Sequence, residues 1–225
     1  MKIVVLPGLD GTGRLVDSFV HELAGEHDVQ VISYPIKLTS YSEIGHWLER
    51  HLPQDDFAIV AESFSGPLAI IIARHNPKTI KALVLFSTFA RSPRKLPSVL
   101  IDALNYIPYF PDVVAFVSLP FVVGRVRQRS FLASYRVALR KLPLSTLAGR
   151  LRAVLEVDVR ESLAGIDVPI AYIRATRDRF IPTSVSSDLR PYCDLYRLID
   201  APHFVLQTKP QEAADVVLDF LQERR

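Results

Sequence analysis

The sequence predicts an α/β fold in which a mostly parallel six-stranded sheet is covered by helices on both faces. Six short segments are apolar and rich in β-branched residues, which is typical of buried parallel strands. These segments are residues 2–6, 29–33, 57–61, 82–86, 169–174 and 195–199. Helical patterns lie between most of them and after the last, at residues 14–24, 41–51, 65–76 and 211–223. Strands and helices that alternate in this way are joined by right-handed crossovers into one sheet.

The first predicted strand lies in the N-terminal segment "MKIVVLPG". Its apolar run has four residues before Pro7, which is too short for a secretory signal peptide. With 225 residues the chain has the size of one large domain, or of one domain with an insertion. The single cysteine, Cys193, cannot form an internal disulfide, which fits a reducing compartment. We therefore expect a soluble, cytoplasmic protein.

The second and third predicted strands each lead to a recognisable helix start. The segment "SYSE", residues 40–43, is a capping box in which Ser40 and Glu43 would bond free backbone N–H groups. The third strand runs into "VAESFSGPLA", residues 60–69, where two serines stand at the strand–helix junction. Reactive groups of a parallel sheet gather where strands end and helices begin, so this junction is a candidate site.

Between the fourth and fifth predicted strands the alternation stops. No strand is predicted from Arg91 to Gly165, and the apolar run 96–124 is divided by prolines into short helices. The prolines of residues 91–165 lie at positions 93, 97, 108, 111, 120 and 143. A transmembrane helix needs about 20 uninterrupted apolar residues, and no segment reaches that length. We therefore expect a helical cap, residues 91–165, above the C-terminal edge of a core formed by residues 1–90 and 166–225.

The predicted cap differs from the core in charge. Between Arg91 and Arg160 the chain has 12 Lys or Arg and 4 Asp or Glu, whereas the remainder has 15 basic and 20 acidic residues. A positive segment on a negative body indicates contact with something anionic. The alternative interpretation is a solvated, arginine-rich helical surface.

Of the two serines in "AESFSGP", Ser63 is the better candidate nucleophile. A nucleophile at a strained strand–helix turn needs small residues two positions before and after it. Ala61 and Ser65 meet this requirement for Ser63. For Ser65, Pro67 would stand two positions on, and Ser65 itself falls inside the predicted helix. Each serine alone could equally be an ordinary helix cap.

A serine hydroxyl needs a base and an orienting acid before it can act as a nucleophile. His203, in "DAPHFVLQ", follows the last predicted strand, and Asp178, in "RATRDRFIP", follows the fifth. The chain order is therefore Ser63, Asp178, His203, each at the end of a strand, which is the order of one known type of catalytic triad. The remaining histidines lie on or near predicted helices, where packing or surface roles are expected: His21, His27, His46, His51 and His75.

The glycine-rich segment "LPGLDGTG", residues 6–13, follows the first predicted strand. It lacks the Gly-Lys-Ser/Thr ending of a phosphate-binding loop, and it has two of the three glycines of a dinucleotide fingerprint. In a serine hydrolase, such a loop brings a backbone N–H close to the substrate oxyanion. We predict that Leu9, or alternatively Asp10, supplies this donor and that Phe64 supplies the second.

With the segments "PGLDGTG", "AESFSGP", "TRDRFIP" and "APHF", the whole chain resembles the α/β-hydrolase superfamily of serine esterases, thioesterases and lipases. It departs from many members in having "PG" where His-Gly is common, and Ala61 and Ser65 where glycines are usual. The resemblance implies an α/β-hydrolase fold without the first two usual strands. The six remaining strands would then lie in the spatial order 2-1-3-4-5-6.

These residues and this resemblance predict a serine hydrolase that cleaves carboxylic esters or thioesters through an acyl-Ser63 intermediate. Four alternatives stay open: acyl transfer to an alcohol, hydrolysis of pimeloyl-type methyl esters on a carrier protein, proton abstraction as in a lyase, and an inactive binding protein. No cofactor or metal is predicted, because the histidines are scattered and Cys193 has no ligand partners. No nucleic-acid partner is expected.

The predicted cap also suggests how an acyl substrate is held. Its phenylalanines would line a pocket for the acyl chain, or alternatively insert into a membrane surface. Its arginines would meet a phosphate, a carboxylate, or the acidic surface of a carrier, as in CoA or acyl-carrier-protein derivatives. The candidate substrate-binding residues are Asp10, Phe110, Phe116, Phe121, Arg125, Arg127 and Arg129.

Overall fold

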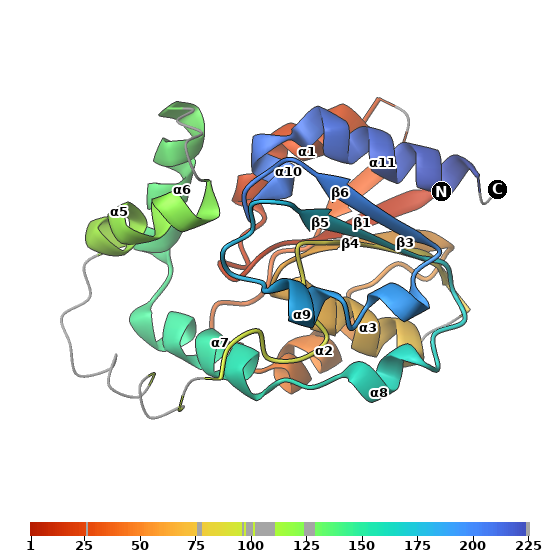
Figure 1. Ribbon diagram of the computed structural model, residues 1–225, viewed down its shortest axis with the longest axis horizontal. Helices are drawn as coiled ribbons and strands as arrows, with labels where there is room; N and C mark the ends of the chain where they lie inside the picture. Colours follow the sequence, from red (N-terminus) through yellow and green to blue (C-terminus); the bar gives the residue numbers. More distant parts are fainter. Residues whose placement is uncertain are drawn as a thin grey trace.

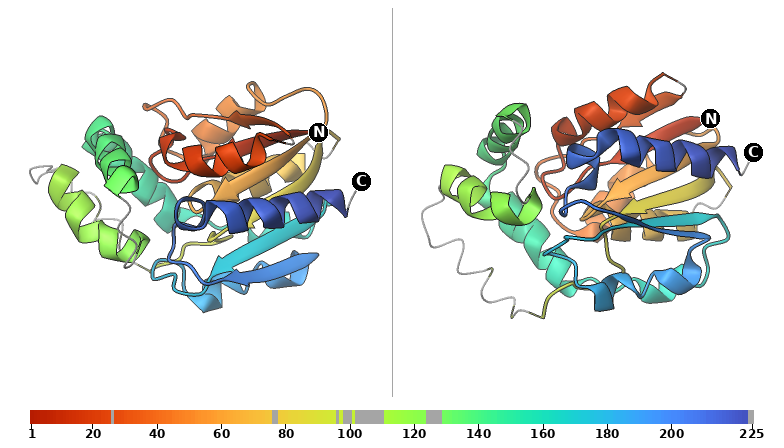
Figure 2. Two further views of the ribbon diagram at one scale, coloured as in Figure 1. Left: turned by 90° about the horizontal axis from the view of Figure 1, so that it is seen from above. Right: turned by 45° about the horizontal axis from the view of Figure 1, so that its top comes forward.

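The computed structural model describes residues 1–25, 27–75, 78–95, 97, 101, 111–123 and 129–223 (Figure 1). For residues 117, 120–122, 129 and 130 it describes the backbone alone. A central sheet carries a layer of helices on each face, and further helices lie beyond one end of the strands (Figures 1 and 2).

The sheet has six strands, and every neighbouring pair is parallel. The strands are β1 (Lys2–Leu6), β2 (Asp28–Val31), β3 (Phe57–Glu62), β4 (Ile80–Phe86), β5 (Ile170–Ala175) and β6 (Leu195–Ile199). Their spatial order is β2-β1-β3-β4-β5-β6, so both the predicted parallel sheet and its predicted strand order are confirmed. β3 is buried along its whole length, because it lies inside the sheet and is covered on both faces.

Two separate cores lie on the two faces of the sheet, because successive side chains of a strand point to opposite sides. Val4 and Leu6 belong to one core, whereas Ile3 and Val5 belong to the other. The first face is covered by α2 (Tyr41–Glu49), α3 (Ser65–His75), α8 (Arg160–Leu163) and α9 (Thr183–Ser186). The second face is covered by α1 (Asp17–Leu23), which follows the 3-10 helix η1 (Arg14–Val16), and by α10 (Val205–Thr208) and α11 (Pro210–Gln222).

The predicted capping box at the start of α2 is present. The Ser40 side chain accepts a hydrogen bond from the Glu43 backbone N–H at 3.2 Å, and Glu43 Oε2 accepts one from the Ser40 N–H at 3.0 Å. These bonds satisfy two N–H groups that the helix leaves without intrahelical partners.

Three helices, α5 (Pro111–Val122), α6 (Arg129–Lys141) and α7 (Leu144–Glu156), lie beyond the C-terminal ends of the strands. α5 and α6 pack on each other through Ala115, Tyr135 and Leu139, and this cluster rests on Leu15 of η1. Among the described helices, none is long and apolar enough to cross a membrane.

The two ends of the segment predicted as the cap are joined to each other. The Val159 N–H donates to Ala90 O at 2.7 Å, and the Ser92 N–H donates to Val157 O at 2.8 Å. α8, which lies within residues 91–165, packs through Leu163 into the core on the first face of the sheet. The end of this segment is thus part of the body, whereas α5 and α6 lie beyond the strand ends and contact the body at Leu15 and Phe204 (Figure 1).

Candidate active site

Ser63 occupies a sharp turn between β3 and α3. Its φ is 54°, a left-handed conformation that is uncommon for a residue other than glycine. The turn is held because the Ser63 N–H donates to Phe86 O at 3.0 Å and the Thr88 hydroxyl donates to Ser63 O. A non-glycine residue at positive φ persists only where its surroundings fix it, and such positions cluster at functional sites.

Gly66 allows this turn to pack against Thr88, two residues after the end of β4. A Cβ added at Gly66 would lie 1.9 Å from Thr88 Oγ1, so no larger residue fits while Thr88 keeps its position. Sequence reasoning concentrated on Ala61 and Ser65 and missed this glycine. The segment "SFSG" contained the signal, because the close approach falls three rather than two positions after Ser63.

Ser65 is engaged elsewhere. Its side chain is fully buried, and its hydroxyl donates to the carbonyl oxygen of Pro7. Since a hydroxyl has one hydrogen, the 2.6 Å contact between Tyr34 Oη and Ser65 Oγ is donated by Tyr34. Ser65 therefore ties the loop after β1 to the start of α3, and it has no free proton to offer a base.

The structure brings Ser63, His203 and Asp178 into one hydrogen-bonded chain. Ser63 Oγ lies 2.8 Å from His203 Nε2, and His203 Nδ1 lies 2.8 Å from Asp178 Oδ2. The side chains of His203 and Asp178 are 5% and 1% exposed. With Nδ1–H donating to the carboxylate, Nε2 is the acceptor for the serine proton.

The loops after β5 and β6 hold the acid and the imidazole in place. Asp178 Oδ1 accepts hydrogen bonds from the backbone N–H groups of Phe180 at 2.7 Å and Ile181 at 3.0 Å. The rings of Phe180 and Phe204 lie 5.1 Å and 5.7 Å from the His203 ring. Both the tautomer and the direction of the imidazole are therefore fixed.

A second buried carboxyl, Glu62, directly precedes Ser63. It accepts hydrogen bonds from Gln207 Nε2 at 2.7 Å and from the Leu206 N–H at 3.3 Å. Burial raises the pKa of Glu62 to about 7, although these two bonds and the nearby His203 act in the opposite direction. Sequence reasoning gave Glu62 no role, because an acidic residue at the end of a strand carries no signal of burial.

The loop after β1 lies beside Ser63. Leu9, Asp10 and Phe64 line the same cavity as Ser63. Among the described residues, no acceptor is assigned to the backbone N–H of Leu9 or of Phe64. Asp10 Oδ2 accepts hydrogen bonds from the Thr12 N–H at 2.9 Å and from the Thr12 hydroxyl, and burial raises the pKa of Asp10.

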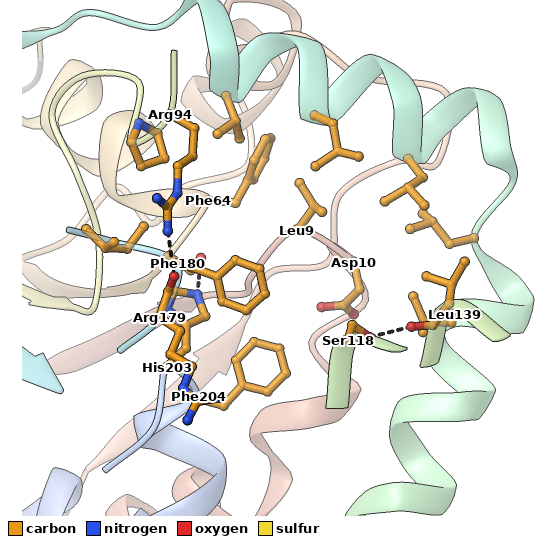
Figure 3. Close-up of a pocket in the computed structure, with 18 of the residues that line it drawn as sticks. Leu9, Asp10, Phe64, Arg94, Ser118, Leu139, Arg179, Phe180, His203 and Phe204 are labelled. Carbon is orange, nitrogen blue, oxygen red and sulfur yellow. Dashed lines mark hydrogen bonds between the residues drawn. The ribbon is translucent and has the colours of Figure 1, made fainter. Parts of the chain in front are cut away.

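Ser63 and His203 open into a cavity of about 550 Å³ between the strand ends and the helices α5, α6 and α7 (Figure 3). Its walls are mainly apolar. Among the described lining residues, polar side chains other than Ser63 and His203 are few: Asp10 and Ser118, with Tyr135 Oη 2.8 Å from Ser118 Oγ, on one side, and Arg94 and Arg179 on the side of Phe180. The apolar lining includes Leu15, Phe89, Val114, Leu139, Leu142, Leu147, Leu151, Val154, Leu155, Ile181 and Phe204.

The predicted substrate-binding residues differ in where they lie. Asp10 lines the cavity, but Phe116 does not: its side chain is 72% exposed. Phe116 lies two residues from Val114 and from Ser118, so it is on the opposite side of α5 from these cavity residues. Phe110, Arg125 and Arg127 lie outside the described residues, as do the side chains of Phe121 and Arg129. Among the described residues, no three His, Cys, Asp or Glu side chains form a group that could hold a metal ion.

Neither a family model nor a curated protein matches this sequence. Solved structures do match. The enol-lactonase from Burkholderia xenovorans LB400 has a TM-score of 0.87 at 18% identity, covering 98% of this chain and 91% of that chain. A thermophilic esterase from Thermogutta terrifontis has a TM-score of 0.83 at 16% identity, covering 99% and 90%. A hydrolase from Pseudomonas aeruginosa PA01 has a TM-score of 0.81 at 21% identity, covering 98% and 89%. On this likeness, and on its sheet order, the chain has the α/β-hydrolase fold.

Proposed function

We propose that this protein is a serine hydrolase that cleaves carboxylic esters or thioesters through an acyl-Ser63 intermediate. The observation that carries the proposal is the hydrogen-bonded chain from Ser63 through His203 to Asp178, with Ser63 facing an apolar cavity. A serine, a base and an orienting acid in this geometry are what acyl transfer requires.

The reaction follows from the positions of these atoms. Ser63 Oγ attacks the acyl carbon while its proton moves to His203 Nε2, 2.8 Å away. The tetrahedral intermediate collapses, the bond to the leaving group breaks, and the departing oxygen or sulfur takes the proton from His203. Water then attacks the acyl-serine by the same route, which releases the acid and returns a proton to Ser63 Oγ.

The negative charge that develops on the acyl oxygen needs donors that are already in place. Leu9 and Phe64 line the cavity together with Ser63, and their backbone N–H groups have no assigned acceptor among the described residues. We therefore assign them as the oxyanion donors. Such donors contribute roughly 10²–10³-fold each to kcat.

Labelling with a fluorophosphonate probe tests the nucleophile. The wild type should be labelled, and Ser63→Ala should lose labelling completely. Ser65→Ala serves as the matched control, because Ser65 is two residues away but bonded to Pro7 O; it should label more slowly but still label. Equal labelling of the wild type and Ser63→Ala would refute the assignment. Silence of the wild type toward p-nitrophenyl esters of every chain length and toward acyl thioesters would favour an inactive binding protein.

Two arginines that line the cavity favour an acyl donor with an anionic group. Arg94 and Arg179 line the cavity that contains Ser63, and the Arg94 side chain donates to Arg179 O at 2.7 Å (Figure 3). Among the described residues, none of the assigned ion pairs includes Arg94 or Arg179. An anionic substrate group, such as that of a carrier-linked acyl ester, would be attracted to them.

Salt dependence separates this second candidate from hydrolysis of neutral esters. Changing Arg94 and Arg179 together to Ala should raise KM for a carboxylate-bearing ester and leave KM for a neutral ester of equal length unchanged. The wild-type preference should also shrink as added salt shortens the range of charge interactions, about 8–10 Å at physiological ionic strength. An equal response of both esters would leave the neutral ester as the substrate class.

A further inference from the structure

One arginine of helix α7 is completely buried. Arg150 has no exposed surface, and among the described residues every hydrogen bond assigned to its guanidinium goes to a backbone carbonyl. Nη1 bonds Asp10 O at 2.8 Å and Leu9 O at 2.9 Å, Nε bonds Leu38 O at 3.2 Å, and Nη2 bonds Pro35 O at 3.3 Å. A guanidinium has five N–H donors, and four of them are used here. Because a buried guanidinium is costly, this use of its donors indicates a defined task.

The two shortest of these bonds go to the loop that contains the proposed oxyanion donor. A peptide group is planar and trans, so its C=O and N–H point in opposite directions and are oriented together. Arg150 holds Asp10 O, which orients the N–H of Gly11 in the same peptide group. That N–H donates to Gly8 O at 3.0 Å, and the peptide group of Gly8 O carries the N–H of Leu9. Two peptide groups and the hydrogen bond between them therefore link the Arg150 side chain to the Leu9 N–H.

Gly11 is adapted to this contact. Its φ is +68°, and an added Cβ would lie 2.4 Å from Arg150 Nη1. The same loop is held from the other side, where the Tyr34 N–H donates to Gly11 O at 2.8 Å and the Ser33 hydroxyl donates to Thr12 O at 2.7 Å. Arg150 also lies over the Tyr34 ring, 5.9 Å from its centre.

We propose that Arg150 is a positioning residue, which aims the Leu9 N–H at the substrate oxyanion and so couples helix α7, whose side chains line the cavity, to the catalytic loop. This inference rests on the proposed hydrolase function. It requires that Arg150 act on the transition state more than on the bound substrate, because the oxyanion forms only during the reaction.

The test compares Arg150→Lys with a matched control, Thr146→Val. Thr146 lies one turn earlier on α7, is buried, and donates to Ile36 O at 2.8 Å, so its loss also removes a buried bond to the loop after β2. Three quantities are measured for each variant: kcat and KM with p-nitrophenyl butyrate, the Ki of a trifluoromethyl ketone that forms an oxyanion on Ser63, and the Ki of an ether analogue without a carbonyl.

For Arg150→Lys we expect kcat to fall by about 10–100-fold, since a displacement of about 1 Å at a reacting centre can cost 10²-fold. The Ki of the ketone should rise by the same factor, while KM and the Ki of the ether analogue stay within about twofold of the wild type because neither depends on an oxyanion. Thr146→Val should lower the melting temperature but leave the ratio of the two Ki values unchanged.

Two results would overturn the proposal. One is that Arg150→Lys weakens both inhibitors equally. The other is that Arg150→Lys behaves like Thr146→Val and leaves the ratio of the two Ki values unchanged. If Arg150→Lys does not fold, Gly11→Ala replaces it, because its Cβ displaces the same guanidinium from the loop side; failure of both variants to fold would show that the contact supports the fold rather than the site. An inactive wild type that the fluorophosphonate does not label would instead refute the hydrolase function itself.

Discussion

The cavity has two walls that are built by different forces. The wall at the strand ends consists of loops whose groups are fixed by individual hydrogen bonds, such as Asp178 Oδ1 to the Phe180 N–H at 2.7 Å and Arg150 to Leu9 O at 2.9 Å. The opposite wall, formed by α5 and α6, is held mainly by apolar contacts around Ala115, Tyr135 and Leu139. Directional bonds fix atoms to within tenths of an ångström, whereas apolar contacts tolerate exchange of similar side chains. We therefore expect changes in the first wall to affect the rate of the chemical step, and changes in the second to affect the choice of substrate.

The largest effect is expected at the hydrogen bond between Asp178 and His203. Asp178→Asn keeps the shape of the side chain, but its amide would donate where the carboxylate accepts from Nδ1–H, which favours the wrong tautomer of the imidazole. We expect kcat to fall by about 10⁴-fold with little change in KM. Steady-state kinetics with p-nitrophenyl butyrate measure this. A loss of less than about tenfold would show that Asp178 does not orient the base.

A smaller but still large effect on stability and kcat is expected where the turn at Ser63 contacts Thr88, after β4. Gly66→Ala places a Cβ against Thr88, which donates to Ser63 O, and overpacking of this kind costs about 1–3 kcal/mol. Both the stability and kcat should fall, because the strained turn must move. Chemical denaturation and kinetics should show that Thr88→Ala restores part of the loss in the double variant. Strict additivity of the two changes would mean that the contact does not constrain the turn.

Glu62, at the wall formed by the strand ends, is expected to make the stability of the protein depend on pH. Its pKa is raised to about 7 in the folded protein from 4.5, because burial disfavours the charged form. The folded state then binds more protons than the unfolded state between about pH 4.5 and 7, so the stability contributed by this group falls as pH rises through that window. Glu62→Gln removes the titration, and its amide can donate to Gln207 Oε1, a buried acceptor with no assigned partner among the described residues.

The gain in the free energy of unfolding for Glu62→Gln is expected to be larger at pH 8 than at pH 5 by on the order of 2–3 kcal/mol, and it should vanish below about pH 4. Urea denaturation at the two pH values measures the difference. A gain of the same size at both values would show that Glu62 is charged throughout and that its burial has another basis.

The comparison of the two walls also explains what the sequence could predict. Ser63, Asp178 and His203 could be proposed because each follows a strand, and parallel strands bring their C-terminal ends to one edge. The six strands followed from short apolar segments separated by helical patterns, whereas their order was implied by the resemblance to the α/β-hydrolase superfamily. Arg150 could not be found in this way, because its partners are the backbone carbonyls of residues 9, 10, 35 and 38. Every residue has a backbone carbonyl, so the residue type does not indicate such a partner.

The cap was harder to predict for a different reason. α5 is apolar around its whole circumference, so its sequence contains no periodic pattern that would identify the face toward the cavity. Phe116 was therefore predicted to bind substrate, although it is exposed and the smaller Val114 and Ser118 line the cavity. Insertion of the exposed Phe116 into a membrane is the alternative to an acyl pocket, and flotation with anionic liposomes would test it.

The smallest effects are expected on α5, where two positions form a matched pair. Val114→Phe adds volume at the cavity wall, whereas Phe116→Ser removes an exposed ring two residues away. Each CH₂ of an acyl chain that loses its place in an apolar cavity forfeits about 0.8 kcal/mol, or roughly fourfold in kcat/KM. Val114→Phe should therefore reduce kcat/KM for p-nitrophenyl octanoate relative to the butyrate by about tenfold, which corresponds to the loss of one to two methylene sites.

Phe116→Ser should leave the same ratio within about twofold and the stability within about 0.5 kcal/mol, as is usual for an exposed position. The pair is informative because both changes are on one helix, and only the face differs. If Phe116→Ser shifted the chain-length preference as strongly as Val114→Phe, the face of α5 that contacts substrate would differ from the one in the structure. The helices α5 and α6 would then have to rotate when substrate binds, and the second wall would differ from the first in mobility as well as in the forces that hold it.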